Sequence, residues 1–225
     1  MKPRNLIATA TAPDGTELEL FERDGTFNIH ADGLPLMGTR MHHSEEELAR
    51  LVCTDCGPGA RALIGGLGLG YTLRATLDLL PSDGNVVQVE LVQAIVDWNR
   101  GPLAEFAGRP LEDRRVDLQM GDISAAVRTH ENTFSAIMLD VDNGPSPVVD
   151  ERNAWLYTDA GLYALRRALT SDGSLAIWSA DEDLTFPSRL EQNGFEPERH
   201  MVHARPGRKG PRHFIYVGRK MDVHQ

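Results

Sequence analysis

Acidic side chains follow several of the short apolar segments in this 225-residue chain. Glu90 ends the segment 85–90, Gly121 and Asp122 follow the segment 116–119, and Asp140 and Asp142 follow the segment 136–139. Such carboxylates can accept hydrogen bonds from ribose hydroxyls or from an exocyclic amine such as adenine N6, and they can hold and deprotonate a cationic amine. Open α/β sheets bind their ligands beyond the carboxyl ends of the strands, so we expect these acids to share one pocket.

A glycine-rich turn precedes these acids. The apolar strand predicted at 61–65 runs into Gly66, Gly68 and Gly70, and a helix pattern follows. Glycine tolerates positive φ angles and lets a ligand approach the backbone, while the amides at the start of the next helix face that ligand. Glu90 ends a second strand about twenty residues later, the position of a ribose ligand. This pattern predicts a site for a nucleoside-containing cofactor; a tight turn followed by a surface acid is the plainer alternative.

Two other strand ends could complete the pocket. Asn143 places an amide beside Asp140 and Asp142, and Trp178 ends the segment 175–178, where its ring could form a stacking wall. Taken singly, an aspartate after a strand often starts a turn or caps a helix. Their occurrence at consecutive strand ends favours a shared pocket.

The elements that must position these residues alternate between strands and helices. Strands are predicted at 61–65, 85–90, 115–119, 134–140 and 173–179, with further strands near 196–203 and 212–218; helices are predicted at 70–80, 91–100, 123–129, 158–169 and 185–193. Short continuous apolar strands are typical of sheets covered by helices on both faces. The fold class is therefore α/β, with a doubly wound, Rossmann-like sheet.

The first forty residues have a different pattern. Alternating segments at 16–22 and 26–31 and a short one at 34–38 are separated by the turn pairs Asp24-Gly25 and Asp32-Gly33, which predicts a small antiparallel meander. Ser44 and Glu47 have the spacing of a capping box that opens a helix through about Val52. We therefore expect a β-rich cap over residues 1–43 and a nucleoside-binding transferase domain over residues 44–225.

Composition narrows the class of protein. Hydrophobic residues make up 41% and charged residues 25% of the chain, as in ordinary globular proteins, and we expect a cytoplasmic protein because neither a signal sequence nor a membrane span is recognisable. The chain has a formal net charge of −10. Residues 199–220 carry +7, so the remaining residues carry −17, and this acidic majority disfavours nucleic-acid binding. Cys53 and Cys56 lack further ligands at zinc-site spacing, so we expect no metal and incidental reduced thiols.

The order of these motifs resembles the spermidine synthase (polyamine aminopropyltransferase) family. The motifs are the glycine turn with Leu73-Arg74, Val89-Glu90, Gly121-Asp122, Ala136–Asp140, Leu156-Tyr157, Leu165–Leu169 and Asp172–Trp178. The resemblance covers residues 15–218 and implies a class I methyltransferase fold behind an amino-terminal β-domain. It also makes Glu90 the ribose ligand, Asp122 the adenine ligand, and Asp140 the acid that orients or deprotonates the attacking amine.

The chain departs from the family pattern at the donor and acceptor positions. Leu69 stands where the family has an aspartate that holds the terminal ammonium of decarboxylated S-adenosylmethionine. An apolar side chain there would leave a charge without its partner. The family's Tyr-His-Glu segment is replaced by residues around His42 and His43, which could face the acceptor or lie in a surface loop. Tyr71 could narrow the donor pocket or pack the start of its helix.

Three functions follow from the resemblance and its departures. The first expectation is transfer of a methyl group from S-adenosylmethionine to the nitrogen of a small cationic acceptor. The alternative is aminopropyl transfer from decarboxylated S-adenosylmethionine, with Asp142 or Asn143 replacing the missing ammonium contact. A non-catalytic nucleoside-binding protein is the third. The sequence is compatible with a homodimer and assigns no role to residues 199–220.

Overall fold

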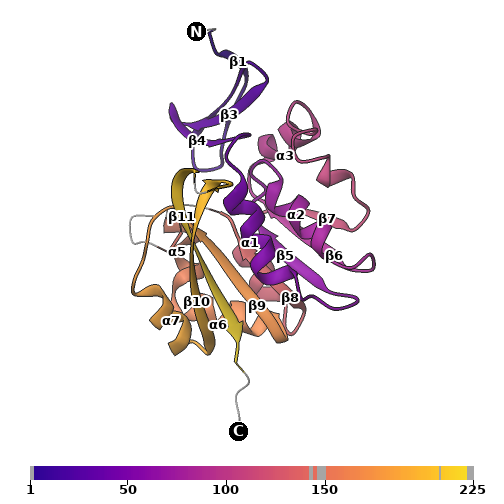
Figure 1. Cartoon of the computed structure of the whole chain (residues 1–225), viewed down its shortest axis with the longest axis vertical. Coiled ribbons are helices and arrows are strands. Elements are labelled where there is room, and N and C mark those ends of the chain that lie inside the picture. Colours follow the sequence, from indigo (N-terminus) through magenta and orange to yellow (C-terminus); the bar gives the residue numbers. More distant parts are fainter. Residues whose placement is uncertain (1–2, 142–143, 146–150, 208, 222–225) are drawn as a thin grey trace.

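The fold contains two β-sheets, and a computed structural model describes residues 3–141, 144–145, 151–207 and 209–221 (Figure 1). The smaller sheet is an antiparallel meander of β1 (Asn5–Thr11), β2 (Glu17–Arg23), β3 (Thr26–Ala31) and β4 (Leu34–Gly38). Both residues of each predicted turn pair, Asp24-Gly25 and Asp32-Gly33, have positive φ, as tight hairpin turns require. The predicted meander is confirmed, while the edge strand β1 was not predicted.

The larger sheet has seven strands in the order β10-β11-β9-β8-β5-β6-β7. Its strands are β5 (Arg61–Gly65), β6 (Asn85–Glu90), β7 (Val116–Met120), β8 (Phe134–Leu139), β9 (Leu169–Ser179), β10 (Phe195–Arg205) and β11 (Lys209–Lys220). Strands β5 to β9 pair in parallel, and β10 and β11 form an antiparallel hairpin at one edge. The carboxyl ends of the parallel strands therefore meet at one edge of the sheet.

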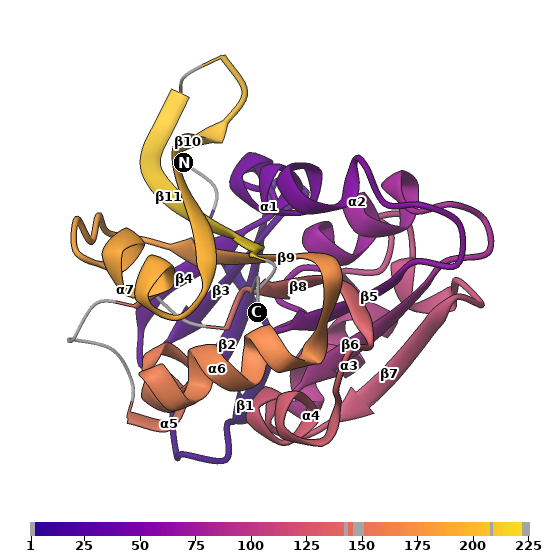
Figure 2. The same cartoon turned by 90° about the horizontal axis from the view of Figure 1, so that it is seen from below.

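Helices cover both faces of the larger sheet (Figure 2). One face packs on α1 (His43–Cys53), α2 (Tyr71–Leu79) and α3 (Gln93–Arg100), and the other on α4 (Ile123–Thr129), α6 (Asp159–Ala168) and α7 (Phe186–Gln192); shorter turns are α5 (Glu151–Ala154), η1 (Pro110–Glu112) and η2 (Trp155–Tyr157). In β5, Ile64 joins the first of these cores and Leu63 the second. This two-sided burial explains the continuous apolar strands and confirms the doubly wound α/β class.

The smaller sheet shares a core with the larger one. Leu18, Leu20 and Ile29 of the meander belong to the same buried cluster as Leu48 of α1 and Leu73 of α2. The two sheets therefore pack through one continuous apolar region, and the boundary at residue 43 stays a prediction. None of the described helices is long and apolar enough to cross a bilayer.

The start of α1 differs from the prediction. The helix begins at His43, and no side chain caps it, so the predicted capping box of Ser44 and Glu47 is wrong. Ser44 lies inside the first turn and is fully buried, where its hydroxyl bonds other side chains, and Glu47 pairs with Arg50 instead. The helix thus starts two residues too early for Ser44 to act as its cap.

Candidate functional site

The glycine turn between β5 and α2 lies against the strand end that carries Asp140. A Cβ atom on Gly66 would lie 2.0 Å from the Asp140 carbonyl oxygen, and Gly66 has a φ of +85°. Both conditions require glycine at this position. Gly68 and Gly70 also have positive φ, and Asn99 of α3 donates a hydrogen bond to the Gly68 carbonyl at 2.8 Å. The backbone is thereby held close to the strand ends, as a ligand-binding turn requires.

Glu90 ends β6 beside this turn and is buried, with 8% of its surface exposed. One carboxylate oxygen accepts the Leu67 amide and the other accepts the Val92 amide, both at 2.8 Å. The pKa of Glu90 lies above its ordinary value because burial raises it more than these backbone hydrogen bonds lower it. Each carboxylate oxygen has a second lone pair, so Glu90 can hold the turn and still accept a ribose hydroxyl.

Asp122 follows β7 and is the N-cap of α4, where its carboxylate accepts the Ser124 amide at 2.7 Å. The sequence left open that this aspartate caps a helix, and Asp122 does cap one. The same residue also lines the cavity described below. Asp122 combines a structural and a ligand-facing position, because one capping bond leaves the carboxylate with further acceptor sites.

Asp140 follows β8 at the centre of the sheet. Its backbone amide donates to the Gly65 carbonyl at 2.9 Å, and Thr72 of α2 donates its hydroxyl to Asp140 Oδ2 at 2.9 Å. Glu45 of α1 lies close enough that the charge of Asp140 affects its titration. Burial, and then repulsion by Asp140, raise the pKa of Glu45 to about 8. The carboxyl groups of Glu45 and Asp140 therefore lie within electrostatic range of each other at this strand end.

A cavity of about 500 Å³ joins these strand ends to the smaller sheet. Gly66, Gly68, Glu90, Gly121, Asp122 and Asp140 line it from the larger sheet, and Asp14, Thr16, Leu18, Ala31, Leu36 and Met37 line it from the meander. The volume and the mixture of apolar wall and carboxylates suit a small organic ligand. The structure therefore brings six of the predicted donor residues around one space, and Leu69 and Gly70 lie outside its wall.

Leu69 is placed differently from its neighbours in the turn. Its side chain is 5% exposed and belongs to the apolar core shared with Leu73, rather than to the cavity wall. Gly70, the N-cap of α2, is likewise outside that wall and faces Asn99 and Pro110. These two residues shape the turn, and contact with a donor at either position has no support in this geometry.

The residues predicted for the acceptor are dispersed. The rings of His42 and Tyr71 stack at 4.2 Å; His42 also pairs with Glu46, and the Tyr71 hydroxyl donates to the Thr39 carbonyl. His43 lines a separate hollow beside β10. Trp178 packs against the ring of His213 at 4.7 Å rather than on the donor cavity. Asp142 and Asn143 lie outside the described residues.

Sequence reasoning missed Glu45, Thr72 and Asp14. Glu45 precedes the buried residues Leu48 and Ala49 by three and four positions, so a charged residue on the buried face of an amphipathic helix was a signal. Thr72 carries no such signal, because a threonine in a first helical turn has many ordinary roles. Asp14 sits in a Pro-Asp-Gly turn, and its sequence context indicates a turn and nothing more.

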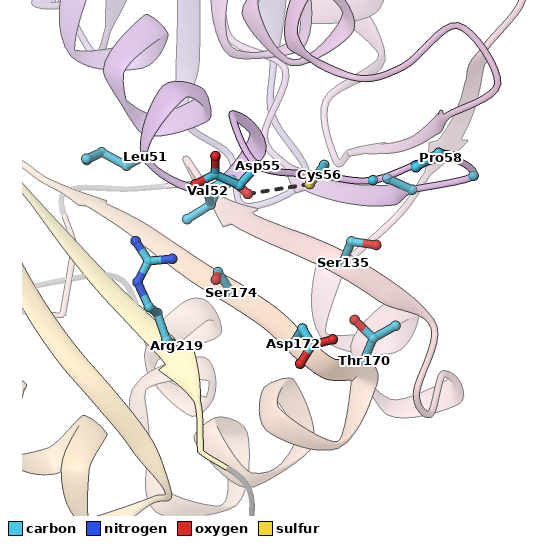
Figure 3. Close-up of a pocket in the computed structure, with 13 residues that line it drawn as sticks. Leu51, Val52, Asp55, Cys56, Pro58, Ser135, Thr170, Asp172, Ser174 and Arg219 are labelled. Atoms are coloured by element: carbon cyan, nitrogen blue, oxygen red, sulfur yellow. Dashed lines mark hydrogen bonds between the residues drawn. The ribbon is translucent and has the colours of Figure 1, made fainter.

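A second hollow, of about 340 Å³, lies near the amino ends of β5 and β8 (Figure 3). Asp172 and Arg219 line it together with Cys56, whose thiol donates to the Val52 carbonyl at 3.6 Å. A hydrogen bond from Cys53 lowers the pKa of Cys56. Among the described residues, no group of three or more His, Cys, Asp or Glu could hold a metal. The hollow is at the edge of the sheet opposite the glycine turn.

Comparison with known proteins gives one consistent result. Residues 41–187 match the spermine/spermidine synthase domain. A polyamine aminopropyltransferase of Nitrosomonas europaea is 31% identical over 132 residues, which are 59% of this chain and 39% of that protein. One from Korarchaeum cryptofilum is 29% identical over 161 residues, which are 72% of this chain and 47% of that protein. The match thus spans less than half the length of either relative.

Solved structures share the fold at lower identity. The spermidine synthase of Thermotoga maritima has a TM-score of 0.76 and 20% identity, covering 96% of this chain and 74% of that one. A spermidine synthase in complex with the transition-state analogue AdoDATO has a TM-score of 0.75 and 19% identity, covering 96% of this chain and 73% of that one.

These relatives bear on the expected reaction. The first expectation, methyl transfer, finds no support among them, and the aminopropyl alternative fits them better. The match to the family domain covers more than half of the chain and includes Glu90, Asp122 and Asp140. The chain belongs to the spermine/spermidine synthase family.

Proposed function

We propose that this protein transfers an aminopropyl group from decarboxylated S-adenosylmethionine to a small amine. The observation that carries the proposal is the convergence of Glu90, Asp122 and Asp140 on one cavity at consecutive strand ends. Membership of the family and relatives named as polyamine aminopropyltransferases support the same reaction.

In this proposal Glu90, Asp122 and the glycine turn form the donor side of the site. Glu90 accepts the ribose hydroxyls, and Asp122 accepts the adenine amine. Gly66 and Gly68 allow the nucleoside to lie against the backbone. Acidic residues also suit the donor, because its sulfonium group is cationic.

Asp140, Thr72 and Glu45 form the acceptor side. An alkylammonium acceptor must lose one proton before its nitrogen lone pair can attack, and Asp140 accepts that proton. Thr72 fixes the orientation of the carboxylate by donating to it. The nitrogen then bonds to the carbon attached to sulfur while the carbon–sulfur electron pair moves to sulfur, which leaves neutral methylthioadenosine.

Leu69 favours a second candidate, transfer of a methyl group from S-adenosylmethionine. It stands where the resembling family has the acid that pairs with the donor ammonium, and it is buried among apolar residues.

Asp14 at the cavity wall offers a carboxylate from another element, and in aminopropyl transfer it would face the propylamine arm. Asp14 is therefore the described residue that we assign to the missing contact.

The by-products separate the two reactions. Aminopropyl transfer leaves methylthioadenosine, whereas methyl transfer leaves S-adenosylhomocysteine. The purified protein should be incubated with either donor and a panel of diamines, and the products identified by mass spectrometry. We expect methylthioadenosine and an aminopropylated amine with the decarboxylated donor. S-adenosylhomocysteine with the other donor would favour the second candidate.

The non-catalytic alternative needs its own test. If the protein binds nucleosides without turnover, methylthioadenosine raises the melting temperature but no donor is consumed with any acceptor. An Asp140→Asn variant that keeps this thermal shift and loses turnover present in the natural protein excludes a purely binding role.

A further inference from the structure

A line of hydrogen-bonding side chains leads away from the acceptor side of the site. Ser44 Oγ lies 2.5 Å from Glu45 Oε2 and 3.0 Å from His213 Nδ1. Ser44 itself is fully buried, so water does not compete for these bonds. The line joins Ser44 of α1 to His213 of β11, which are 169 residues apart in the sequence.

The inner end of this line is Glu45, whose titration is affected by the charge of Asp140. Glu45 is partly accessible, yet burial of its carboxyl group and the nearby charge of Asp140 raise its pKa to about 8. The other ionisable neighbours are Glu46, which pairs with His42, and Tyr71, whose pKa rises to about 12 through burial and then through the charge of Glu45. Near neutral pH the carboxyl group of Glu45 therefore holds a proton.

The outer end of the line is His213. Its ring packs edge-on against Trp178 at 4.7 Å, and it is partly exposed on the hairpin of β10 and β11. Burial lowers the pKa of His213, so its imidazole is neutral near pH 7 and can accept a proton. When Glu45 is protonated it donates to Ser44, which donates to His213 Nδ1; when Glu45 is ionised both bonds reverse.

The proposed reaction must dispose of one proton per turnover. An alkylammonium acceptor becomes a dialkylammonium product while the sulfonium donor becomes a neutral thioether, so one proton leaves with each transfer. Asp140 must release the proton it took from the amine before the next cycle. Asp140 is partly exposed at the wall of the cavity, and a donor and an acceptor bound there in the proposed reaction would cover it.

We propose that Glu45, Ser44 and His213 form a relay that carries the amine proton from Asp140 to solvent. The proton on Asp140 passes to Glu45 as Glu45 gives its own proton to Ser44 and Ser44 gives its proton to Nδ1 of His213, which then loses a proton to water from Nε2. No oxidant or reductant is needed, and each bond broken is matched by one formed. The inference rests on the proposed function, since it assigns the exit of that reaction's proton.

Kinetics of His213→Gln and Ser44→Ala test the relay when aminopropyl transfer is found. We expect kcat to fall about tenfold to hundredfold with little change in KM, because proton removal is slowed and binding is not. In the natural protein kcat should decrease as the pH falls through the pKa of His213, and this limb should disappear in His213→Gln. Imidazole in the buffer should partly restore a His213→Ala variant.

A matched control is His203→Gln on the same hairpin. His203 is partly exposed and its ring contacts the Gly210 carbonyl rather than Ser44, so the control should keep the natural kcat and pH profile. If His213→Gln also keeps both, the relay is wrong. Equal losses in His203→Gln and His213→Gln would attribute the effect to the hairpin and would also overturn the relay.

A measurement without turnover separates this inference from the proposed function. The ¹⁵N shifts of the His213 ring report its tautomer and its hydrogen bonds. Glu45→Gln should change the His213 Nδ1 shift and its titration although the two residues are not in contact, and the His203 signals should stay constant. An unchanged His213 signal in Glu45→Gln and Ser44→Ala overturns the relay, whether or not the protein transfers aminopropyl groups.

Discussion

The proposed donor and acceptor sides of the site are built in different ways. The donor side uses backbone geometry, with a glycine turn and two acids, of which Glu90 ends β6 and Asp122 lies two residues after β7. The acceptor side brings Glu45, Thr72 and Asp140 together from α1, α2 and the end of β8. The donor side is thus a property of local segments, and the acceptor side is a property of tertiary packing.

Asp140→Asn should separate the two sides most clearly. An amide cannot accept the amine proton, so we expect kcat to fall about 10²- to 10⁴-fold. The apparent affinity for methylthioadenosine, measured from its thermal shift, should stay within about twofold of that of the natural protein, because the donor contacts remain. The exposed Asp117 of β7 provides the control Asp117→Asn. A loss of methylthioadenosine binding in Asp140→Asn would show that the two sides are not independent.

Gly66→Ala should damage the donor side. The added Cβ meets the Asp140 carbonyl oxygen at 2.0 Å and forces an alanine to a φ of +85°. We expect a loss of about 2 kcal/mol or more in the free energy of unfolding, measured in urea, together with loss of methylthioadenosine binding. Gly59→Ala is the control, since Gly59 has a φ of +70° but no atom within 4 Å of the added Cβ. Equal destabilisation by both variants would assign the effect to φ strain alone.

Glu90→Gln should weaken donor binding without changing the chemistry. The side chain of glutamine has one oxygen in place of two. The backbone N–H of either Leu67 or Val92 then loses its acceptor, and fewer lone pairs remain for a ribose hydroxyl. We expect about a 10- to 100-fold rise in the dissociation constant for methylthioadenosine by calorimetry. The exposed Glu131→Gln is the control. A kcat that fell more than the affinity would contradict the division into two sides.

Glu45→Gln should have the smallest effect, on the pH dependence of stability. The pKa of Glu45 is raised to about 8 in the folded protein from an ordinary value of 4.5, so the folded state binds more protons between these values. The natural protein therefore loses stability as the pH rises from about 4.5 to 8. We expect the melting temperature of Glu45→Gln, relative to that of the natural protein, to be higher at pH 9 than at pH 4.5. A pH-independent difference would contradict the burial of Glu45.

The fold and the donor side could be predicted because their signals are local. Apolar strands, Asp-Gly turns and the spacing from glycine turn to Glu90 are each visible within a few residues, and the structure contains those strands and turns. The larger errors fell where packing decides the outcome. Ser44 has the sequence pattern of a helix cap, but α1 begins before it and packing places its hydroxyl beside His213 of β11. Leu69 lies in the glycine turn, and packing against α2 places its side chain in the core rather than on the cavity wall.

On the proposed acceptor side, Asp140 was predicted, but Glu45 and Thr72 were missed for the same reason. The sequence places His42, His43 and Glu45 within four positions, but a helix turns successive side chains about 100° apart. His42 faces Tyr71, His43 faces β10, and Glu45 faces Asp140. Which of the three meets the strand end depends on the start of α1, and the start predicted from the capping box was wrong.

The smaller sheet supplies part of the cavity wall, through Leu36 and Met37 among others, and this has a thermodynamic consequence. A ligand held between the two sheets must be released, or lose contacts, before the meander can detach. Occupancy and local opening are therefore linked equilibria, and a bound ligand should slow hydrogen exchange at the amides of β3 and β4 more than at those of α6. The free energy needed to detach the meander then increases with the affinity of the ligand that it covers.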